Sequence, residues 1–220
     1  MSTTIRVWDL PTRMFHWLLV LCVIGLLVTA NIGGPAMAWH FRFGYVVMAL
    51  LVFRLIWGFI GGRWSLFSSF LYSPASLWRD LRGRHPDTVV GHSPRGALSV
   101  FAMLSFLLAQ VSTGLFSDDE ISATGPLTSL VSSSWVALAT YYHTSVGKFV
   151  IIALAIAHVG AIFLYWFRSG QNLLLPMILG DKEFSQPVHS SRDDSRMRVL
   201  AALVFLACLG LVVAVLDLRA

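Results

Sequence analysis

The chain alternates between long apolar runs and short polar connectors. Five runs, at about 14–31, 40–60, 96–116, 143–167 and 197–216, approach the ~20 residues that a helix needs to cross a bilayer. The first four form two hairpins around a longer polar connector. The fifth follows a charged stretch, 180–196, which we expect to be an exposed loop. The pattern predicts an all-α integral membrane protein with a four-helix domain (1–180), a connector (181–196) and an additional C-terminal transmembrane helix (197–220).

The composition agrees with a surface that faces lipid. Of 220 residues, 56% are hydrophobic and 12% are charged, whereas a soluble domain typically has about 25% charged residues. The first apolar run lacks a small-residue cleavage site, so we expect a retained span and not a signal peptide. Cys22 and Cys208 lie within apolar runs and are interpreted as small buried side chains.

The net charge of +5 does not indicate nucleic-acid binding, because most cations lie in short connectors, where positive charge fixes membrane orientation. With a cytoplasmic N-terminus, twelve of the 16 Lys and Arg residues lie inside, three lie within the spans, and Arg219 alone lies outside. We therefore expect a cytoplasmic N-terminus and an external C-terminus. The inner set is Arg6, Arg13, Arg63, Arg79, Arg82, Arg84, Arg95, Arg168, Lys182, Arg192, Arg196 and Arg198.

Seven histidines divide into two groups. Three lie in inner connectors among Arg, Pro and Ser and are expected to be solvated loop residues: His85, His92 and His189. The other four belong to apolar runs, where an ionisable side chain is costly and therefore a functional candidate. These are His16, His40, His143 and His158.

The depths of the four histidines match in pairs. His16 opens the first helix on the inner side, whereas His40 and His143 open the second and fourth helices on the outer side. His158 follows His143 by fifteen residues, which places it about 22 Å deeper in a regular helix and about 60° away around the axis. In a core about 30 Å thick this is near the level of His16. We predict an inner pair, His16 with His158, and an outer pair, His40 with His143.

Each pair is a candidate axial ligand set for a b-type haem. Gly44 and Gly147 follow the outer histidines by four residues, on the same helix face, and are expected to clear space for the macrocycle. Around His158 the small neighbours are Ala155 and Ala161. Ordinary helix packing is the alternative explanation for all these small residues. Zinc is disfavoured, because its sites need closer ligand clusters, and the absence of Cys-x-x-Cys-His excludes a c-type attachment.

Three cations lie within the apolar runs: Arg42, Arg54 and Lys148. We interpret them as partners for haem propionates, with snorkelling to the lipid headgroups as the open alternative. The segment from Pro74 to Arg84 is predicted to lie amphipathically on the inner surface, with Leu77, Trp78 and Leu81 toward lipid.

Several motifs, in order, carry a family resemblance. They are Val7-Trp8-Asp9-Leu10-Pro11-Thr12-Arg13-Met14-Phe15-His16-Trp17, His40-Phe41-Arg42-Phe43-Gly44-Tyr45, Arg54-Leu55-Ile56-Trp57-Gly58-Phe59-Ile60-Gly61, and the later His143 and His158. Over about residues 5–180 the chain resembles the cytochrome b561 bacterial/Ni,Fe-hydrogenase b-type cytochrome superfamily. The resemblance implies a four-helix bundle with two haems b in a bacterial inner membrane, and electron exchange with quinone and a redox partner. The fifth helix departs from this pattern, and its role is open.

Three functions compete. The leading hypothesis is a respiratory cytochrome b that passes electrons between the quinone pool and a periplasmic cytochrome c or hydrogenase, because bis-histidine haem iron suits electron transfer. The second is a stand-alone superoxide:quinone oxidoreductase of the same fold. The third is a non-redox transporter with a histidine proton relay. The outer connector carries Asp118, Asp119 and Glu120, either to steer a basic periplasmic partner or as a solvated acidic turn. Oligomeric state is open.

Overall fold

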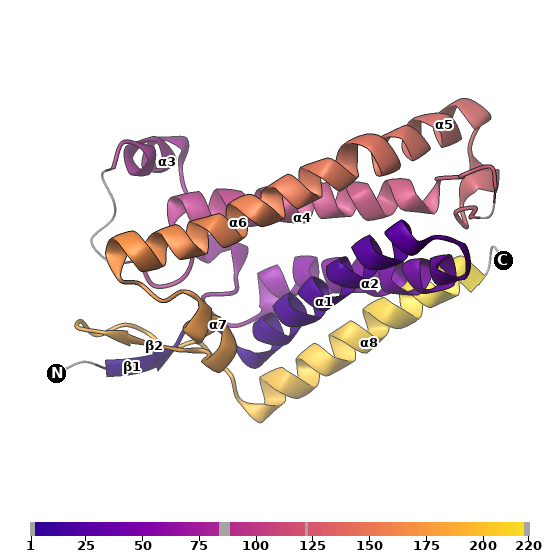
Figure 1. The fold of residues 1–220 in the computed structure, drawn as a ribbon. Helices are drawn as coiled ribbons and strands as arrows, with labels where there is room; N and C mark the ends of the chain where they lie inside the picture. The colour runs from indigo at the N-terminus through magenta and orange to yellow at the C-terminus, as the bar shows by residue number, and fades with distance from the viewer. Residues whose placement is uncertain (1–2, 84–88, 122, 218–220) are drawn as a thin grey trace. The chain divides into compact units, whose positions relative to one another are not determined.

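The computed structural model describes residues 3–83, 89–121 and 123–217, and these are largely helical (Figure 1). His85, Arg84 and Arg219 lie outside the described residues. The α-helices are α1 (Leu10–Ile32), α2 (Met37–Ile60), α3 (Pro74–Leu81), α4 (Pro94–Leu115), α5 (Ser133–Tyr141), α6 (Lys148–Ser169), α7 (Leu174–Leu179) and α8 (Ser195–Asp217). A π-helical turn, η4 (Tyr142–Gly147), joins α5 to α6, and short 3₁₀ turns are η1 (Gly34–Ala36), η2 (Phe67–Ser69) and η3 (Thr128–Leu130).

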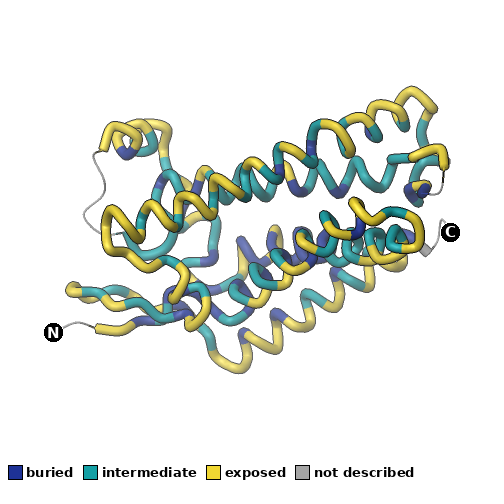
Figure 2. The backbone as a smooth tube through the Cα atoms, viewed as in Figure 1, coloured by how far each residue is buried: buried dark blue, intermediate teal, exposed yellow. Residues whose placement is uncertain are grey.

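Five helical stretches among the described residues are long and apolar enough to cross a membrane, as the hydrophobic pattern predicts. They are Leu10–Ile32, Gly34–Ile60, Pro94–Leu115, Ser133–Ser169 and Ser195–Leu216. Much of α6 and α8 is exposed (Figure 2). Their exposed residues include the apolar Phe163, Phe167 and Leu203. Such a surface suits lipid contact and would be costly in water.

The fourth stretch differs from the prediction. Its 37 residues comprise α5, η4 and α6 without a break, so His143 lies ten residues after Ser133 and does not open the helix. Trp135 and Tyr141, which precede the helix start expected at about residue 143, are helical. The reason is local: between Ser133 and His143 there is no Gly or Pro to delay the start of the helix.

Two compact units divide the chain, and each takes parts of several helices. Unit 1 draws on Met1–Phe15, Arg54–Ala102 and Ile156–Leu203. Unit 2 draws on His16–Phe53, Met103–Ala155 and Val204–Ala220.

In unit 1 the strands β1 (Thr3–Arg6) and β2 (Asp181–Phe184) pair antiparallel, with Thr3 opposite Phe184 and Arg6 opposite Asp181 (Figure 1). Gly180 ends α7 at a φ of 95°, and a Cβ there would lie 2.8 Å from the carbonyl oxygen of Trp8. The expectation of an exposed loop over 180–196 is therefore wrong for Asp181–Phe184, whereas most residues of 185–194 are exposed and lie outside helices and strands. The backbone of Asp181–Phe184 pairs with the N-terminus, a long-range contact that local polarity does not reveal.

The start of α1 is fixed by a buried carboxylate. Asp9 accepts hydrogen bonds from the backbone N–H of Thr12 at 2.8 Å, from Ser65 Oγ at 2.5 Å and from Trp57 Nε1 at 3.3 Å. The first is an N-cap interaction. The others connect α1 to the end of α2 and the loop that follows it, so two of the motifs that carry the family resemblance are in direct contact through Asp9 and Trp57.

The carboxylate of Asp193 forms hydrogen bonds with residues at the ends of several elements of unit 1. It accepts from Arg6 Nη1 at 2.9 Å, from the Leu10 backbone N–H at 3.1 Å and from Arg198 Nε at 3.0 Å. Arg13 Nη2 lies 4.0 Å away. These residues, named here the Asp193 cluster, connect β1 and α1 to the first turn of α8.

The connector between α2 and α4 holds a short amphipathic helix, α3, and its location on the inner membrane surface remains a prediction. Asp80 is buried and accepts from Arg95 Nε at 2.8 Å, whereas Trp78 and Leu81 are exposed and Leu77 is half-buried. His92 is not the solvated loop residue that its polar neighbours suggested.

The ring of His92 lies between aromatic side chains, 4.7 Å from Trp8 and 4.6 Å from Phe70, centroid to centroid. Aromatic packing from distant segments thus overrides the polar local sequence. His189 is exposed, as expected.

Candidate functional site

His40 and His143 lie side by side in unit 2. His40 is in the first turn of α2 and His143 is in the π turn η4. Their ring centroids are 6.2 Å apart and their planes are almost perpendicular, at 86°. The structure therefore brings the outer pair together from two segments about a hundred residues apart in the sequence.

Both imidazoles are oriented by backbone carbonyls. His40 Nδ1 lies 3.1 Å from the Leu26 carbonyl oxygen of α1, and His143 Nδ1 lies 2.8 Å from the Gln110 carbonyl oxygen of α4. A carbonyl can only accept, so Nδ1 carries the proton in both rings and Nε2 keeps a lone pair. This is the arrangement that holds metal-ligating histidines in proteins.

The separation of the rings fits one metal ion between them. Two metal–imidazole bonds of about 2 Å each, plus about 1 Å from each nitrogen to its ring centre, give about 6 Å, and 6.2 Å is observed. Among the residues that the structure describes, no group of three or more His, Cys, Asp or Glu side chains meets as a metal site. Two protein ligands suffice when a porphyrin supplies the other four, so the donor set suits haem better than zinc.

Glycines shape the surroundings of the outer pair. A Cβ on Gly44 would meet no atom within 4 Å, so one turn beyond His40 the flank of α2 is open, as a flat macrocycle requires. A Cβ on Gly114 would lie 2.7 Å from His143 Cε1, so the ring rests against the backbone of α4 at this point. Gly114 is not among the site residues predicted from the sequence.

Gly147 has a different neighbour from the one expected. A Cβ there would overlap the side-chain amide oxygen of Gln110, so this glycine admits Gln110 and does not open space beside His143. The amide Nε2 of Gln110 donates to the carbonyl oxygen of His143 at 2.9 Å. Gln110 therefore holds His143 twice, through its own carbonyl and through its side chain. A polar amide within an apolar run was the sequence signal for it.

The cations near the outer pair are placed on aromatic rings. The Arg42 guanidinium lies 4.8 Å from the ring centre of Trp39, and Lys148 Nζ lies 4.9 Å from that of Phe149. Within the described ranges neither forms an ion pair with a carboxylate.

Arg54, in unit 1, is 3% exposed, so snorkelling to the headgroups is excluded for it. Its guanidinium lies 4.7 Å from the ring centre of Phe67, and Asp9 is the carboxylate that acts on it electrostatically. Among the described residues its buried Nη1 has no hydrogen-bond partner. A buried unpaired cationic donor is destabilising, so an anionic group fits this position.

The inner histidines fall in different units. His16 lies in the second turn of α1, in unit 2, with its ring centroid 4.9 Å from that of Trp17. His158 lies in α6, in unit 1, and is half-buried. Their pairing remains a prediction. The 60° offset between His143 and His158 assumed a regular α-helix, and the π turn with its i→i+5 bonds changes that rotation.

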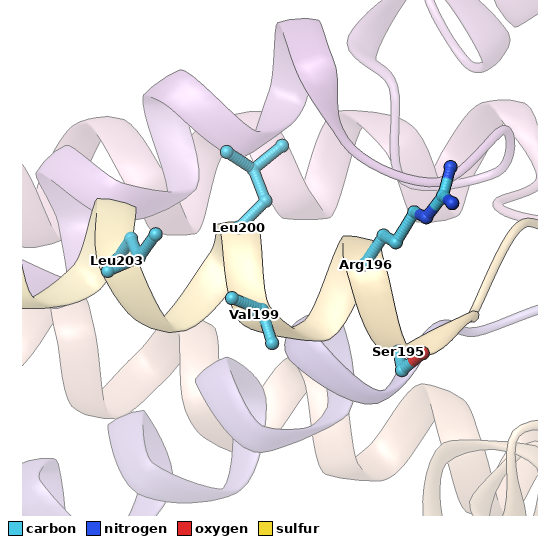
Figure 3. A pocket seen from close by; sticks show the side chains of 5 residues that line it. All are labelled: Ser195, Arg196, Val199, Leu200 and Leu203. Carbon is cyan, nitrogen blue, oxygen red and sulfur yellow. The ribbon is translucent and has the colours of Figure 1, made fainter.

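A shallow hollow also lies on α8, lined by Ser195, Arg196, Val199, Leu200 and Leu203. Arg196 and Leu200, one turn apart, project from the same side of the helix (Figure 3). None of these five side chains is a haem-iron ligand type, and an apolar lining with one cation at the helix end suits lipid.

Comparisons with known proteins identify the family of the chain. Residues 7–180 match the family described as prokaryotic cytochrome b561. The "Probable Ni/Fe-hydrogenase 1 B-type cytochrome subunit" of Escherichia coli is 27% identical over 135 residues, which are 49% of this chain and 57% of that protein. The chain thus spans little more than half the length of this relative. No solved structure matches the chain.

Two relatives align over most of their length. The "Probable Ni/Fe-hydrogenase B-type cytochrome subunit" of Bradyrhizobium diazoefficiens is 24% identical over 218 residues, 82% of this chain and 87% of that protein. The protein of the same name from Rhizobium leguminosarum is 25% identical over 219 residues, which are 82% of this chain and 90% of that protein. Because the family match covers the histidine-bearing helices and most of the chain, this membrane protein belongs to the prokaryotic cytochrome b561 family of b-type cytochromes.

Proposed function

We propose that the chain passes electrons across the bacterial inner membrane between the quinone pool and a periplasmic redox partner, through two b-type haems. The observation that carries the proposal is the outer pair, in which two imidazoles with ring centroids 6.2 Å apart are each held at Nδ1 by a backbone carbonyl, so that Nε2 keeps the lone pair that a metal needs. A b-type haem held there supplies reversible one-electron chemistry at its iron. Saturation by two imidazoles leaves no open position, which favours electron transfer over oxygen chemistry.

The other site residues have supporting roles in this proposal. His16 and His158 hold the inner haem. The open flank at Gly44 accommodates the edge of the outer macrocycle. Arg42 and Lys148 near the outer ligands, and buried Arg54 in unit 1, neutralise propionates, because an anion in a poor dielectric needs a nearby cation.

We infer that the partner is a hydrogenase or a cytochrome c. The relatives named above are hydrogenase cytochrome subunits. The distribution of Lys and Arg supports an N-terminus in the cytoplasm, which puts the connector 117–132 outside. There Asp119 accepts from the backbone N–H groups of Ile121 and Ala123, and Glu120 is exposed. An exposed acidic tip of defined shape suits docking of a basic protein surface.

The proposal is tested by the haem content of the purified, full-length protein. We expect two haems b per chain in the parent, and one in His40→Ala, in His143→Ala and in His158→Ala. His189→Ala, at an exposed histidine, is the matched control and should keep both. The measurement is the reduced-minus-oxidised spectrum with pyridine haemochrome quantification. A colourless parent, after expression with ample haem, would refute the proposal.

Membership of the b561 family sets the proton-relay transporter aside. The superoxide:quinone oxidoreductase differs from the leading proposal in its need for a partner. Quinone reduction by superoxide with the purified protein alone would favour this second function, whereas electron delivery only in the presence of a periplasmic redox protein would favour the first.

A further inference from the structure

The two carbonyls that orient the outer imidazoles share a second feature. Each lies within hydrogen-bond distance of a threonine hydroxyl three residues further along its helix, whose single proton is shared with the carbonyl four residues before the threonine. In α1, the Leu26 carbonyl oxygen lies 3.1 Å from His40 Nδ1 and 3.2 Å from Thr29 Oγ1. In α4, the Gln110 carbonyl oxygen lies 2.8 Å from His143 Nδ1 and 3.0 Å from Thr113 Oγ1. One arrangement thus occurs twice, on two helices and toward two partner segments.

Back-bonding alone does not account for this arrangement. A threonine in a membrane helix commonly donates to the carbonyl four residues earlier, and both residues do: Thr29 to Gly25 at 2.7 Å and Thr113 to Ala109 at 2.8 Å. Thr144 makes the same bond to Thr140 at 2.8 Å, but no histidine uses that carbonyl. Thr29 and Thr113 differ because their second acceptor is the carbonyl that holds an imidazole. Thr29 Oγ1 also lies 3.3 Å from His40 Nδ1.

The shared carbonyl has a predictable effect on the imidazole. A carbonyl oxygen that accepts a hydroxyl proton has less negative charge for its other donor, so the Nδ1–H bond from histidine is weaker. A strong Nδ1–H bond raises the basicity of a ligating imidazole, and a more basic ligand stabilises ferric iron. Both hydroxyls therefore lower the basicity of a ligating imidazole, which makes ferric iron less stable. Both affect the same metal position, between His40 and His143.

We propose that Thr29 and Thr113 are positioning residues that raise the reduction potential of the outer haem by sharing the carbonyls that orient its two ligands. The inference rests on the proposed function, because it needs iron between His40 and His143. It goes beyond ligand identity, since it assigns the tuning of the ligands to two hydroxyls that touch neither the iron nor a substrate.

The test is a spectroscopic redox titration of the purified full-length protein. His143→Ala first identifies which of the two potentials belongs to the outer haem. In Thr113→Val and in Thr29→Val, which keep the side-chain shape and remove the hydroxyl, the outer potential should fall. The expected change is about threefold in the reduction equilibrium constant for each substitution, or about 30 mV at 59 mV per tenfold. The double variant should show the larger fall, and the inner potential should not move.

The controls separate tuning from folding. Thr113→Ser and Thr29→Ser keep the hydroxyl and should retain the parent potential. Thr144→Val removes a back-bond to a carbonyl that serves no histidine and should also leave it unchanged. The low-spin ferric g-values in electron paramagnetic resonance provide an independent readout, because they report the axial imidazoles directly and should shift in the Val variants alone.

The two proposals fail in different ways. A parent without haem overturns the proposed function. A parent with two haems whose outer potential is unmoved or raised in both Val variants overturns only the role of the threonines. Loss of the outer haem in the Val variants, with retention in the Ser variants, also overturns it, because the hydroxyls would then be needed for haem retention and not for its potential.

Discussion

At the scale of single residues, Arg54 shows how a charged side chain is accommodated within an apolar segment. Arg54 is 3% exposed, its guanidinium lies over the ring of Phe67, and Nη1 has no hydrogen-bond partner within the described part of the chain. Burial of an incompletely paired cation is destabilising unless an anion meets it. In the proposed function that anion is a propionate of the inner haem.

Arg54→Gln should therefore lower the potential of the inner haem, because removal of a nearby positive charge favours ferric iron. In a medium of low dielectric we expect about a tenfold change in the reduction equilibrium constant, close to 59 mV. Redox titration measures it. Arg63→Gln is the matched control, since Arg63 is exposed above the Trp64 ring. An inner potential that is unchanged in Arg54→Gln would contradict the pairing.

Gly147 provides a second test at this scale. A Cβ at Gly147 would overlap the Gln110 amide, which holds the carbonyl of His143, whereas a Cβ at Gly160 would meet no atom within 4 Å. We expect Gly147→Ala to reduce occupancy of the outer haem and to destabilise the fold by about 1–3 kcal/mol, as overpacking does. Gly160→Ala should leave both unchanged. Equal haem content and equal thermal stability in the two variants would count against this role for Gly147.

At the scale of elements, the Asp193 cluster connects β1 and α1 to α8. Burial alone raises the pKa of Asp193. The hydrogen bonds from Arg198 and from the Leu10 backbone, with the charges of Arg198 and Arg6, outweigh burial and hold that pKa below its ordinary 3.8. A depressed carboxylate pKa stabilises the fold fully above the unfolded value, and that stability is lost as the pH falls through the folded value.

We therefore expect the parent to lose stability below about pH 4 in part through Asp193. Asp193→Asn should be less stable at neutral pH and should show a smaller further loss on acidification. Cys22 and Cys208 are buried in the fold, so the reaction of their thiols with a thiol-reactive dye reports thermal unfolding in detergent. The protein is heated at each pH, and the dye reaction itself is run at one fixed pH. Glu183→Gln, at an exposed carboxylate, is the control. Identical pH dependence in Asp193→Asn and the parent would exclude this contribution.

The element scale also shows where pattern reasoning from the sequence stops. Hydropathy located the five membrane-length helices because a membrane span depends on the summed apolarity of about twenty neighbouring residues. It did not reveal the π turn at 142–147, which widens the helix at His143. Nor did it reveal β1 and β2, whose hydrogen-bonding partners are about 180 residues apart in the sequence.

At the scale of the whole molecule, charge and family agree on a membrane cytochrome. The connectors that hold most of the Lys and Arg residues alternate with spans, and this alternation is the basis of the prediction that the N-terminus is cytoplasmic. The match over residues 7–180 covers the three helical stretches that carry the four candidate ligands and ends just before β2. The division into a domain at 1–180, a connector and a fifth helix remains a prediction. The Asp193 cluster shows that the segment before α8 is hydrogen-bonded to residues near the N-terminus.

The sequence by itself determined the five spans and the four histidines within them, because hydrophobic length and the cost of an ionisable group in lipid are local properties. Only the tertiary structure decided what those histidines meet: that His40 and His143 face each other, that the carbonyls of Leu26 and Gln110 orient them, and that Arg54 is buried and not snorkelling. Those facts depend on which side chains and carbonyls adjacent helices bring into contact, as at 3.1 Å for His40 and 2.8 Å for His143. Helix packing sets such contacts, and the order of residues along one helix does not.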